Sequence, residues 1–247
     1  MDERSMGMPS GEAPPLPGRQ PGPPGVAPIE DPRALTILTT EHWSLLSARS
    51  LVYNEAFARA GMFLAFLSAT LVALGLVATA TGFSDEFLMV TAVILALNLF
   101  VGLASLGRIA AASGEDIRYL QGMNRLRHGY HELVPGLERY FVTSKYDDLA
   151  SVLSFYGPVT AGPIRSMVHG LTTTPGMVGV ICSAVGGALC AVIAVLLTRD
   201  TATAAVAGGI GFVVGFVTLT AIMIARVRRE TMGLAAAFPR TDCSGDD

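Results

Sequence analysis

Charged residues are scarce in this sequence, and their absence is concentrated in four stretches. Asp, Glu, Lys and Arg make up 15% of the 247 residues, whereas soluble domains carry about 25%. Four windows of 21 to 23 residues contain none of them: 61–81, 87–107, 177–197 and 203–225. A helix of about 20 residues crosses the hydrocarbon core of a bilayer. We therefore predict an all-α, polytopic membrane protein with four transmembrane helices in two hairpins, rather than a very apolar soluble bundle.

The same four windows also lack histidine, so no Asp, Glu, Lys, Arg or His side chain lies within the predicted spans. Such groups mark proton relays, ion paths and voltage sensors. Their absence argues against a proton-coupled transporter, a pump or an intramembrane protease. Asn98 is the bulkiest polar side chain in the windows. It either lines an oligomeric pore or forms a polar contact with a neighbouring helix, and we favour the contact.

Residue sets that perform catalysis or hold cofactors are missing as well. Cys182 and Cys190 lie eight residues apart in one predicted helix, about 12 Å along its axis and too far for a disulfide. His128 and His131 have a spacing that suits a metal, but no third or fourth ligand stands near them in the sequence. No phosphate-binding glycine loop or nucleophile elbow occurs. We expect no enzyme activity, no cofactor and no metal.

The first 33 residues contain nine of the 14 prolines and no periodic apolar face. A segment of this composition cannot bury enough surface to offset the entropy of ordering it. We therefore predict that residues 1–33 are disordered. No signal peptide precedes the first apolar window, so we expect the first span to remain in the mature protein.

The remaining chain divides at the spans. An amphipathic helix over 39–60, beginning at residue 39 or 40, is expected to pack on the central region rather than to lie on the membrane surface. The helix of the second span is expected to continue inward until it ends near Pro135, and Ser144 is a candidate cap for a short helix that follows. The predicted segments are a first hairpin over 61–108, a helical linker region over 109–175, a second hairpin over 176–227 and a tail over 228–247.

Basic residues are distributed very unevenly between the two sides of the spans. Of the 17 Lys and Arg residues, 16 lie in the N-terminal lead, the linker region and the C-terminal tail, and only Arg199 lies on the other side. Basic residues near span ends are retained in the cytoplasm. We therefore expect an inner (cytoplasmic) membrane protein whose two termini and linker region are cytoplasmic.

Two further residue sets are candidates for contacts. Small residues recur at four-residue intervals and allow close helix packing, within one four-helix bundle or between chains of a homo-oligomer: Gly61, Ala65, Ala69, Ala73, Gly179, Ser183, Gly187, Gly211 and Gly215. Arginines beside the spans and in the linker region are expected to meet anionic lipid head groups or the region's own acids: Arg108, Arg118, Arg125, Arg127, Arg226, Arg228 and Arg229. Because the linker region is charge-balanced, we expect no nucleic-acid binding.

Three segments carry a resemblance to a known group: LVYNEAFARAGMFLAFLSATLVALGL, GMNRLRHGYHELVPGLERYFVTS and YDDLASVLSFYG. Over residues 40–230 the chain resembles uncharacterised integral membrane proteins of high-GC, actinobacterial-type bacteria. That resemblance implies a membrane location and four spans, and no site residue. The sequence therefore favours a non-enzymatic, oligomeric scaffold or regulator that acts through its cytosolic helices on a cytosolic protein partner. The alternative is an oligomeric ion or small-solute channel.

Overall fold

The computed structural model describes residues 31–156, 170 and 173–240. Over these ranges the chain is helical and contains no strand, and four of its helices are long and apolar enough to cross a membrane. This confirms the predicted all-α fold with four candidate spans. The N-terminal tail that is predicted to be disordered covers residues 1–33, and residues 1–30 of it lie outside the described ranges.

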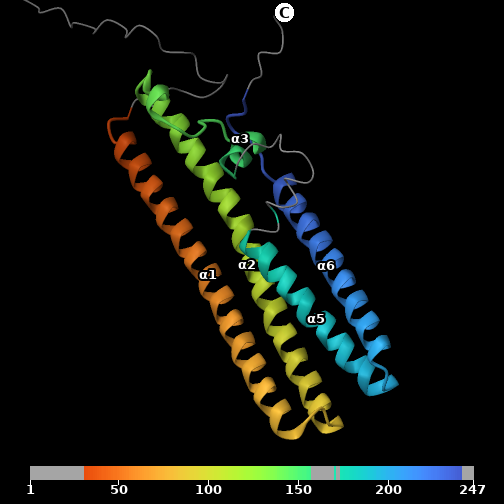
Figure 1. The fold of residues 1–247 in the computed structure, drawn as a ribbon. Helices are drawn as coiled ribbons and strands as arrows, with labels where there is room; N and C mark the ends of the chain where they lie inside the picture. Colours follow the sequence, from red (N-terminus) through yellow and green to blue (C-terminus); the bar gives the residue numbers. More distant parts are fainter. Residues whose placement is uncertain (1–30, 157–169, 171–172, 241–247) are drawn as a thin grey trace, which may run out of the picture.

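The first two long helices are much longer than a bilayer requires. Helix α1 covers Ala34–Thr81, with 48 residues, and α2 covers Asp85–Leu133, with 49 residues. Each is about 72 Å long at 1.5 Å per residue, against a hydrocarbon core of about 30 Å. The amphipathic stretch and the first span therefore form one continuous helix, and about half of each helix projects beyond the spans (Figure 1). Helix α2 ends just before Pro135, where a proline disfavours helical backbone in the preceding residue.

Two helix starts differ from those predicted. Helix α1 begins at Ala34, several residues before the expected start at residue 39 or 40, because Asp31 closes a turn there: its carboxylate accepts the Arg33 N–H at 2.8 Å and its carbonyl accepts the Ala34 N–H at 2.9 Å. The short helix α3, Leu149–Leu153, is capped by Asp148 and not by Ser144. The Asp148 carboxylate accepts the Ser151 N–H at 3.1 Å, whereas the Ser144 hydroxyl accepts the N–H two residues further on, in a turn.

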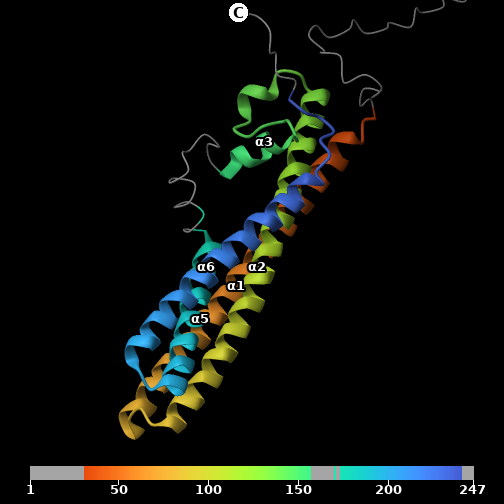
Figure 2. The same cartoon turned by 90° about the vertical axis from the view of Figure 1, so that its right-hand side faces the viewer.

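The four long helices lie side by side in the order α1, α2, α5, α6 (Figure 1). Helix α5 covers Thr174–Thr198 and α6 covers Thr201–Met232. The extensive contacts join α1 to α2, α2 to α5, and α5 to α6. The view turned by 90° places α6 and α5 in front of α2 and α1 (Figure 2). The spans therefore form a row with α1 and α6 at its edges, in place of a closed four-helix bundle.

The centre of the row is packed tightly around one aromatic side chain. Phe63 of α1 is fully buried and lies in a core cluster with Ile109 of α2 and Cys182 of α5. Gly102 makes this close approach feasible, because a methyl group at that position would lie 2.7 Å from the Cys182 sulfur. Three helices therefore meet here at a distance that only a glycine permits.

The two tight turns meet at the outer tips of the hairpins. Gly82 ends α1 with a φ of 64°, in the left-handed region that favours glycine. Arg199 ends α5 with a φ of 57°, and Asp200 caps α6 by accepting backbone N–H groups of its first turn. The Arg199 guanidinium pairs with Asp85 at the start of α2. The single basic residue on this side therefore links the two hairpins.

The opposite end of the molecule carries a separate polar structure, which we call the head. It consists of residues 34–60 of α1, residues 108–156 and the C-terminal segment 234–240, which we call the strap. Between α2 and α3 lies the 3-10 helix η1, Leu137–Tyr140, and η2, Ser154–Tyr156, follows α3. Apolar residues of three elements form its small core: Ile117, Leu120, Val152 and Leu234.

Candidate functional site

Asn98 lies inside the contact between α1 and α2. Its side chain is fully buried, and its amide donates to the Thr70 hydroxyl at 3.0 Å and to the Ile94 carbonyl at 3.1 Å. A hydrogen bond of this kind between membrane helices contributes about 0.6–2 kcal/mol. Within one chain, Asn98 therefore acts as a polar contact between two helices and is not presented to an outer face.

The predicted small-residue positions separate into two groups. In the second hairpin they face one another: Gly187 approaches the Gly208 carbonyl, and Gly215 lies against Ser183. Gly211 lies against Cys190 of α5, and Gly179 faces α2 at ordinary contact distance. The α1 positions lie on an exposed face instead, without a packing partner in the described part of the chain: Gly61, Ala65, Ala69 and Ala73.

Several of the candidate lipid-binding arginines are engaged within the chain at the base of the head. Arg108 bonds Glu55 of α1 at 2.9 Å and Glu115 of its own helix at 3.1 Å. Arg226 of α6 pairs with Glu230 at 3.3 Å. These pairs are partly exposed and each contributes little to stability. They form a band of charge where the helices leave the predicted spans.

The arginines further from the spans belong to the head itself. Arg125 pairs with Asp147 at 2.6 Å. Arg127 is buried and donates to the Asn124 side-chain oxygen at 2.6 Å. The remaining three candidates are exposed and form no ion pair with any described residue: Arg118, Arg228 and Arg229.

A buried carboxylate, Asp116, joins α1, α2 and η2. It is 2% exposed and accepts hydrogen bonds from Arg49 at 2.5 Å and from Tyr53 at 2.8 Å. The Tyr156 hydroxyl donates to it as well. The Arg49 guanidinium also lies 4.6 Å from the centre of the Phe155 ring, within the range of a cation–π contact. The charge is therefore paired and hydrogen-bonded, as a buried charge must be.

The same carboxylate changes the chemistry of the tyrosine beside it. Burial raises the pKa of the Tyr156 hydroxyl, and its hydrogen bond to Asp116 raises the pKa further, because the phenolate would face a negative charge. Tyr156 therefore stays protonated and donates to the carboxylate. This favours a structural hydrogen bond over a role in proton transfer.

A second buried carboxylate, Asp147, holds the strap on the head. It is fully buried and accepts the backbone N–H groups of Ala237 at 2.8 Å and Phe238 at 2.7 Å, besides the Arg125 side chain. Burial raises the pKa of the Asp147 carboxyl, but these donors lower it more, so its pKa lies below the ordinary value. Asp147 is therefore ionised at neutral pH and acts as the central acceptor of the strap.

Polar side chains of α2 complete the attachment of the strap. The Gln121 amide donates to the carbonyls of Asp147 and Ala235, both at 3.1 Å. The Phe238 ring stacks on His128 with ring centres 4.0 Å apart. The strap is recognised mainly through its backbone, because its residues between Leu234 and Phe238 are alanines. The arrangement resembles a peptide held in a groove, with α6 as the tether.

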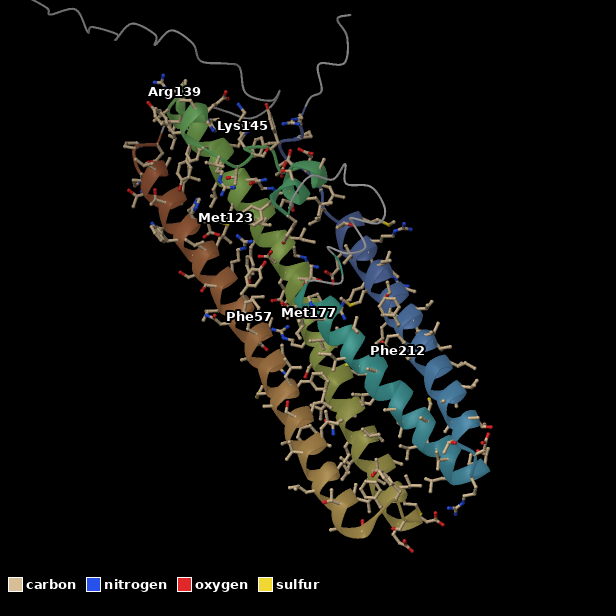
Figure 3. The ribbon with its side chains drawn as sticks, viewed as in Figure 1. Phe57, Met123, Arg139, Lys145, Met177 and Phe212 are labelled. Atoms are coloured by element: carbon tan, nitrogen blue, oxygen red, sulfur yellow. The ribbon has the colours of Figure 1, made fainter. Side chains whose placement is uncertain are left out.

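Next to the strap lies a hollow of about 420 Å³ on the surface of the head. Its wall includes Lys145, Glu138 and His131, and Arg240 from the strap. Lys145 forms an ion pair with Glu138, and this pair lowers the pKa of the Glu138 carboxyl. Lys145 lies near the end of the molecule furthest from the outer turns, beside Arg139 (Figure 3). The volume falls within the range of about 300–1,000 Å³ typical of small-molecule sites.

The two neighbouring histidines of α2 have different surroundings. His128 lies under Phe238, whereas His131 packs edge-on against Phe141 and lines the hollow. Among the described residues, no three His, Cys, Asp or Glu side chains gather in a way that would hold a metal ion.

Sequence reasoning missed the two carboxylates that organise the head. In the sequence, Asp116 and Asp147 stand out only as two of the acids that balance the charge of the linker region. One signal was available for Asp116: Arg49 and Tyr53 stand four residues apart and therefore share a helix face. Nothing in the sequence distinguishes Asp147 from Asp148, because only the position of the strap decides which of the two becomes buried.

A scan against protein-family models finds no match, and searches of curated proteins and of solved structures return no similar chain.

Proposed function

We propose that this protein is a non-enzymatic membrane scaffold or regulator that works through the head. Two features support this. The predicted spans contain no Asp, Glu, Lys, Arg or His, and such side chains within a membrane mark transport pathways. The head, in contrast, is organised by two buried and fully paired carboxylates, Asp116 and Asp147. The proposal rests on this contrast: the spans lack charged and histidine side chains, whereas the head is held together by buried carboxylates with specific partners.

We also propose that the protein lies in the inner (cytoplasmic) membrane, with the head and both termini in the cytoplasm. The basis is the uneven distribution of basic residues, with Arg199 alone at the outer tips. In a variant whose three native cysteines are replaced by alanine, a cysteine at Phe83, which is 80% exposed at the outer turn, is expected to react with a membrane-impermeant maleimide in intact cells. Cysteine at Val142 on the head is expected to react only after permeabilisation. The reverse pattern would contradict the orientation.

The partners proposed with this role are lipid, a second copy and a cytosolic protein. Arg228 and Arg229 are exposed at the end of α6, where anionic head groups of the cytoplasmic leaflet would attract them. The exposed small-residue face of α1 suits a second copy of the chain, because small residues let membrane helices approach closely. The cytosolic partner would bind the head.

Two measurements separate the scaffold from the channel, one on purified protein in liposomes and one in cells. Purified protein in liposomes is expected to leave K⁺ and H⁺ gradients intact. In cells, a photo-crosslinking residue at Val142, which is fully exposed on the head, is expected to give a discrete protein adduct. The same residue at Val206, exposed on α6, is the control and should give lipid adducts only. Flux that Asn98→Leu reduces would contradict the scaffold and support the oligomeric channel.

A further inference from the structure

The hollow beside the strap is lined by groups that suit an anion. Two basic side chains, Lys145 and Arg240, reach it from separate segments of the chain. Hydroxyl groups of Thr143 and Ser144 add neutral donors, whereas the Ser154 hydroxyl already donates to the Ser151 carbonyl at 2.7 Å. A phosphate group carries several oxygens that accept hydrogen bonds from ammonium, guanidinium and hydroxyl groups together. The donors therefore exceed the acceptors in this wall.

Among the described residues, the wall contains one acid, Glu138, and it is placed where a ligand could replace it. Glu138 pairs with Lys145, but the Glu138 side chain is 62% exposed whereas the Lys145 side chain is 20% exposed. The carboxylate thus approaches from the solvent side and the ammonium group from the protein side. An exposed pair contributes little to stability, so an incoming anion displaces Glu138 at low cost.

We propose that this hollow binds a small, soluble, phosphate-bearing anion, with Lys145 and Arg240 as its charged contacts. Among the described residues of the wall, a cation would find one acid, Glu138, which is already paired. A lipid head group does not reach it, because His131 lies 23 residues along α2 from Arg108, about 35 Å beyond the spans, whereas the head-group layer is several ångströms thick. This proposal goes beyond the scaffold function, which requires no ligand.

Binding in the hollow is coupled to the position of the strap. Arg240 ends the described part of the strap, and its backbone N–H donates to Asp148 at 3.3 Å. Two residues earlier, Phe238 is fixed by Asp147. A ligand that contacts Arg240 therefore favours the docked strap, and by linkage the docked strap favours the ligand. Because the strap follows directly from α6, the ligand would connect the head to the edge helix of the membrane row.

A single-lysine footprint tests the proposal directly. Lys145 is the only lysine of the chain, so an amine-reactive acylating reagent labels Lys145 and the amino terminus alone. The full-length protein in nanodiscs is treated with the reagent, with inorganic phosphate or pyrophosphate present, and with acetate at matched ionic strength as the reference. Pyrophosphate at ten times its dissociation constant leaves about one-tenth of the sites free. Acylation of Lys145 is then expected to slow about tenfold, while the amino terminus reacts at an unchanged rate.

Four variants separate this site from a general charge effect. Arg240→Gln removes a charged contact and is expected to weaken pyrophosphate binding about tenfold. Asp147→Asn leaves Arg240 in place but loosens the strap, so it is expected to weaken binding as well. Glu138→Gln removes the competing carboxylate and is expected to strengthen binding. Arg139→Gln is the matched control, since Arg139 is an exposed arginine close by that does not line the hollow.

Three results would overturn the proposal. They are equal protection of Lys145 by acetate, equal loss of affinity in the Arg139 and Arg240 variants, and no protection by phosphate or pyrophosphate at any concentration tested. Since Arg240 and Glu138 are exposed, their replacement leaves the fold intact and the comparison remains interpretable. None of these results would bear on the scaffold function, which is tested by flux and crosslinking.

Discussion

Replacing Asp147 with asparagine tests whether one buried carboxylate holds the strap on the head. The carboxylate accepts N–H groups of Ala237 and Phe238 through different oxygens. Asparagine keeps only one oxygen, and its NH₂ group must then face an N–H donor. At least one strap hydrogen bond is lost, and the negative charge is lost with it. The pair with Arg125 matters less, because the Arg125 side chain is 42% exposed.

The size of the effect follows from these contacts. A hydrogen bond to a charged acceptor contributes about 1.5–3 kcal/mol, and one to a neutral acceptor about 1 kcal/mol. The strap amides can bond to water once released, so the lower value applies to each. In the parent protein, two hydrogen bonds to the charged carboxylate contribute about 1.5 kcal/mol each, whereas in Asp147→Asn one hydrogen bond to the neutral amide oxygen contributes about 1 kcal/mol. The free energy of strap opening falls by about 2 kcal/mol, which corresponds to a factor of about 30.

Hydrogen–deuterium exchange of the strap measures this factor. The backbone amides of Ala237 and Phe238 are expected to exchange about 30-fold faster in Asp147→Asn than in the parent protein in nanodiscs. Asp148→Asn is the matched control, because Asp148 accepts from Ser151 and Arg240 and leaves those two amides protected. Unchanged exchange at Ala237 and Phe238 in Asp147→Asn would refute the conclusion that the Asp147 carboxylate holds the strap on the head.

Three further predictions concern packing, polar contact and pH. Gly102→Ala places a methyl group 2.7 Å from a sulfur of α5. It is expected to lower the free energy of unfolding by about 1–3 kcal/mol, as measured by thermal unfolding, whereas the added methyl group of Gly107→Ala contacts nothing within 4 Å and should leave the stability unchanged. A double-mutant cycle of Asn98→Ala and Thr70→Val is expected to give a coupling energy of about 0.6–1.7 kcal/mol; zero coupling would contradict the hydrogen bond. Because folding lowers the pKa of Asp147, strap protection should be complete above about pH 4 and lost as the pH falls further. Loss of protection between pH 8 and 6 would point to another group.

The local composition of the chain predicts the spans, the two hairpins and the end of α2, because these depend only on residues close together in the sequence. A run of uncharged residues of suitable length is stable in lipid wherever it occurs, so the four spans could be located without any knowledge of their neighbours. Short connections forced the two hairpins, and Pro135 indicated the end of α2. These features need no contact between distant residues.

The starts of the helices were less predictable, because several nearby residues compete for a cap. Asp148 and Ser144 are both good N-cap residues, and the choice depends on where the backbone turns in the folded head. The small-residue pattern was similarly ambiguous. Gly187 and Gly211 pack between helices, whereas Ala65 and Ala69 have the same spacing but lie on an open face.

The sequence by itself therefore determined the solvent of each segment: lipid for four uncharged helices and water for the charged remainder, because transfer between these solvents depends on the composition of the segment. Only the tertiary structure decided the order of the helices, the burial of Asp116 and Asp147 and the docking of the strap. Each of these depends on groups 20 to 120 positions apart in the chain, and the free energy of such a pairing arises only when folding brings the partners together and removes water from between them.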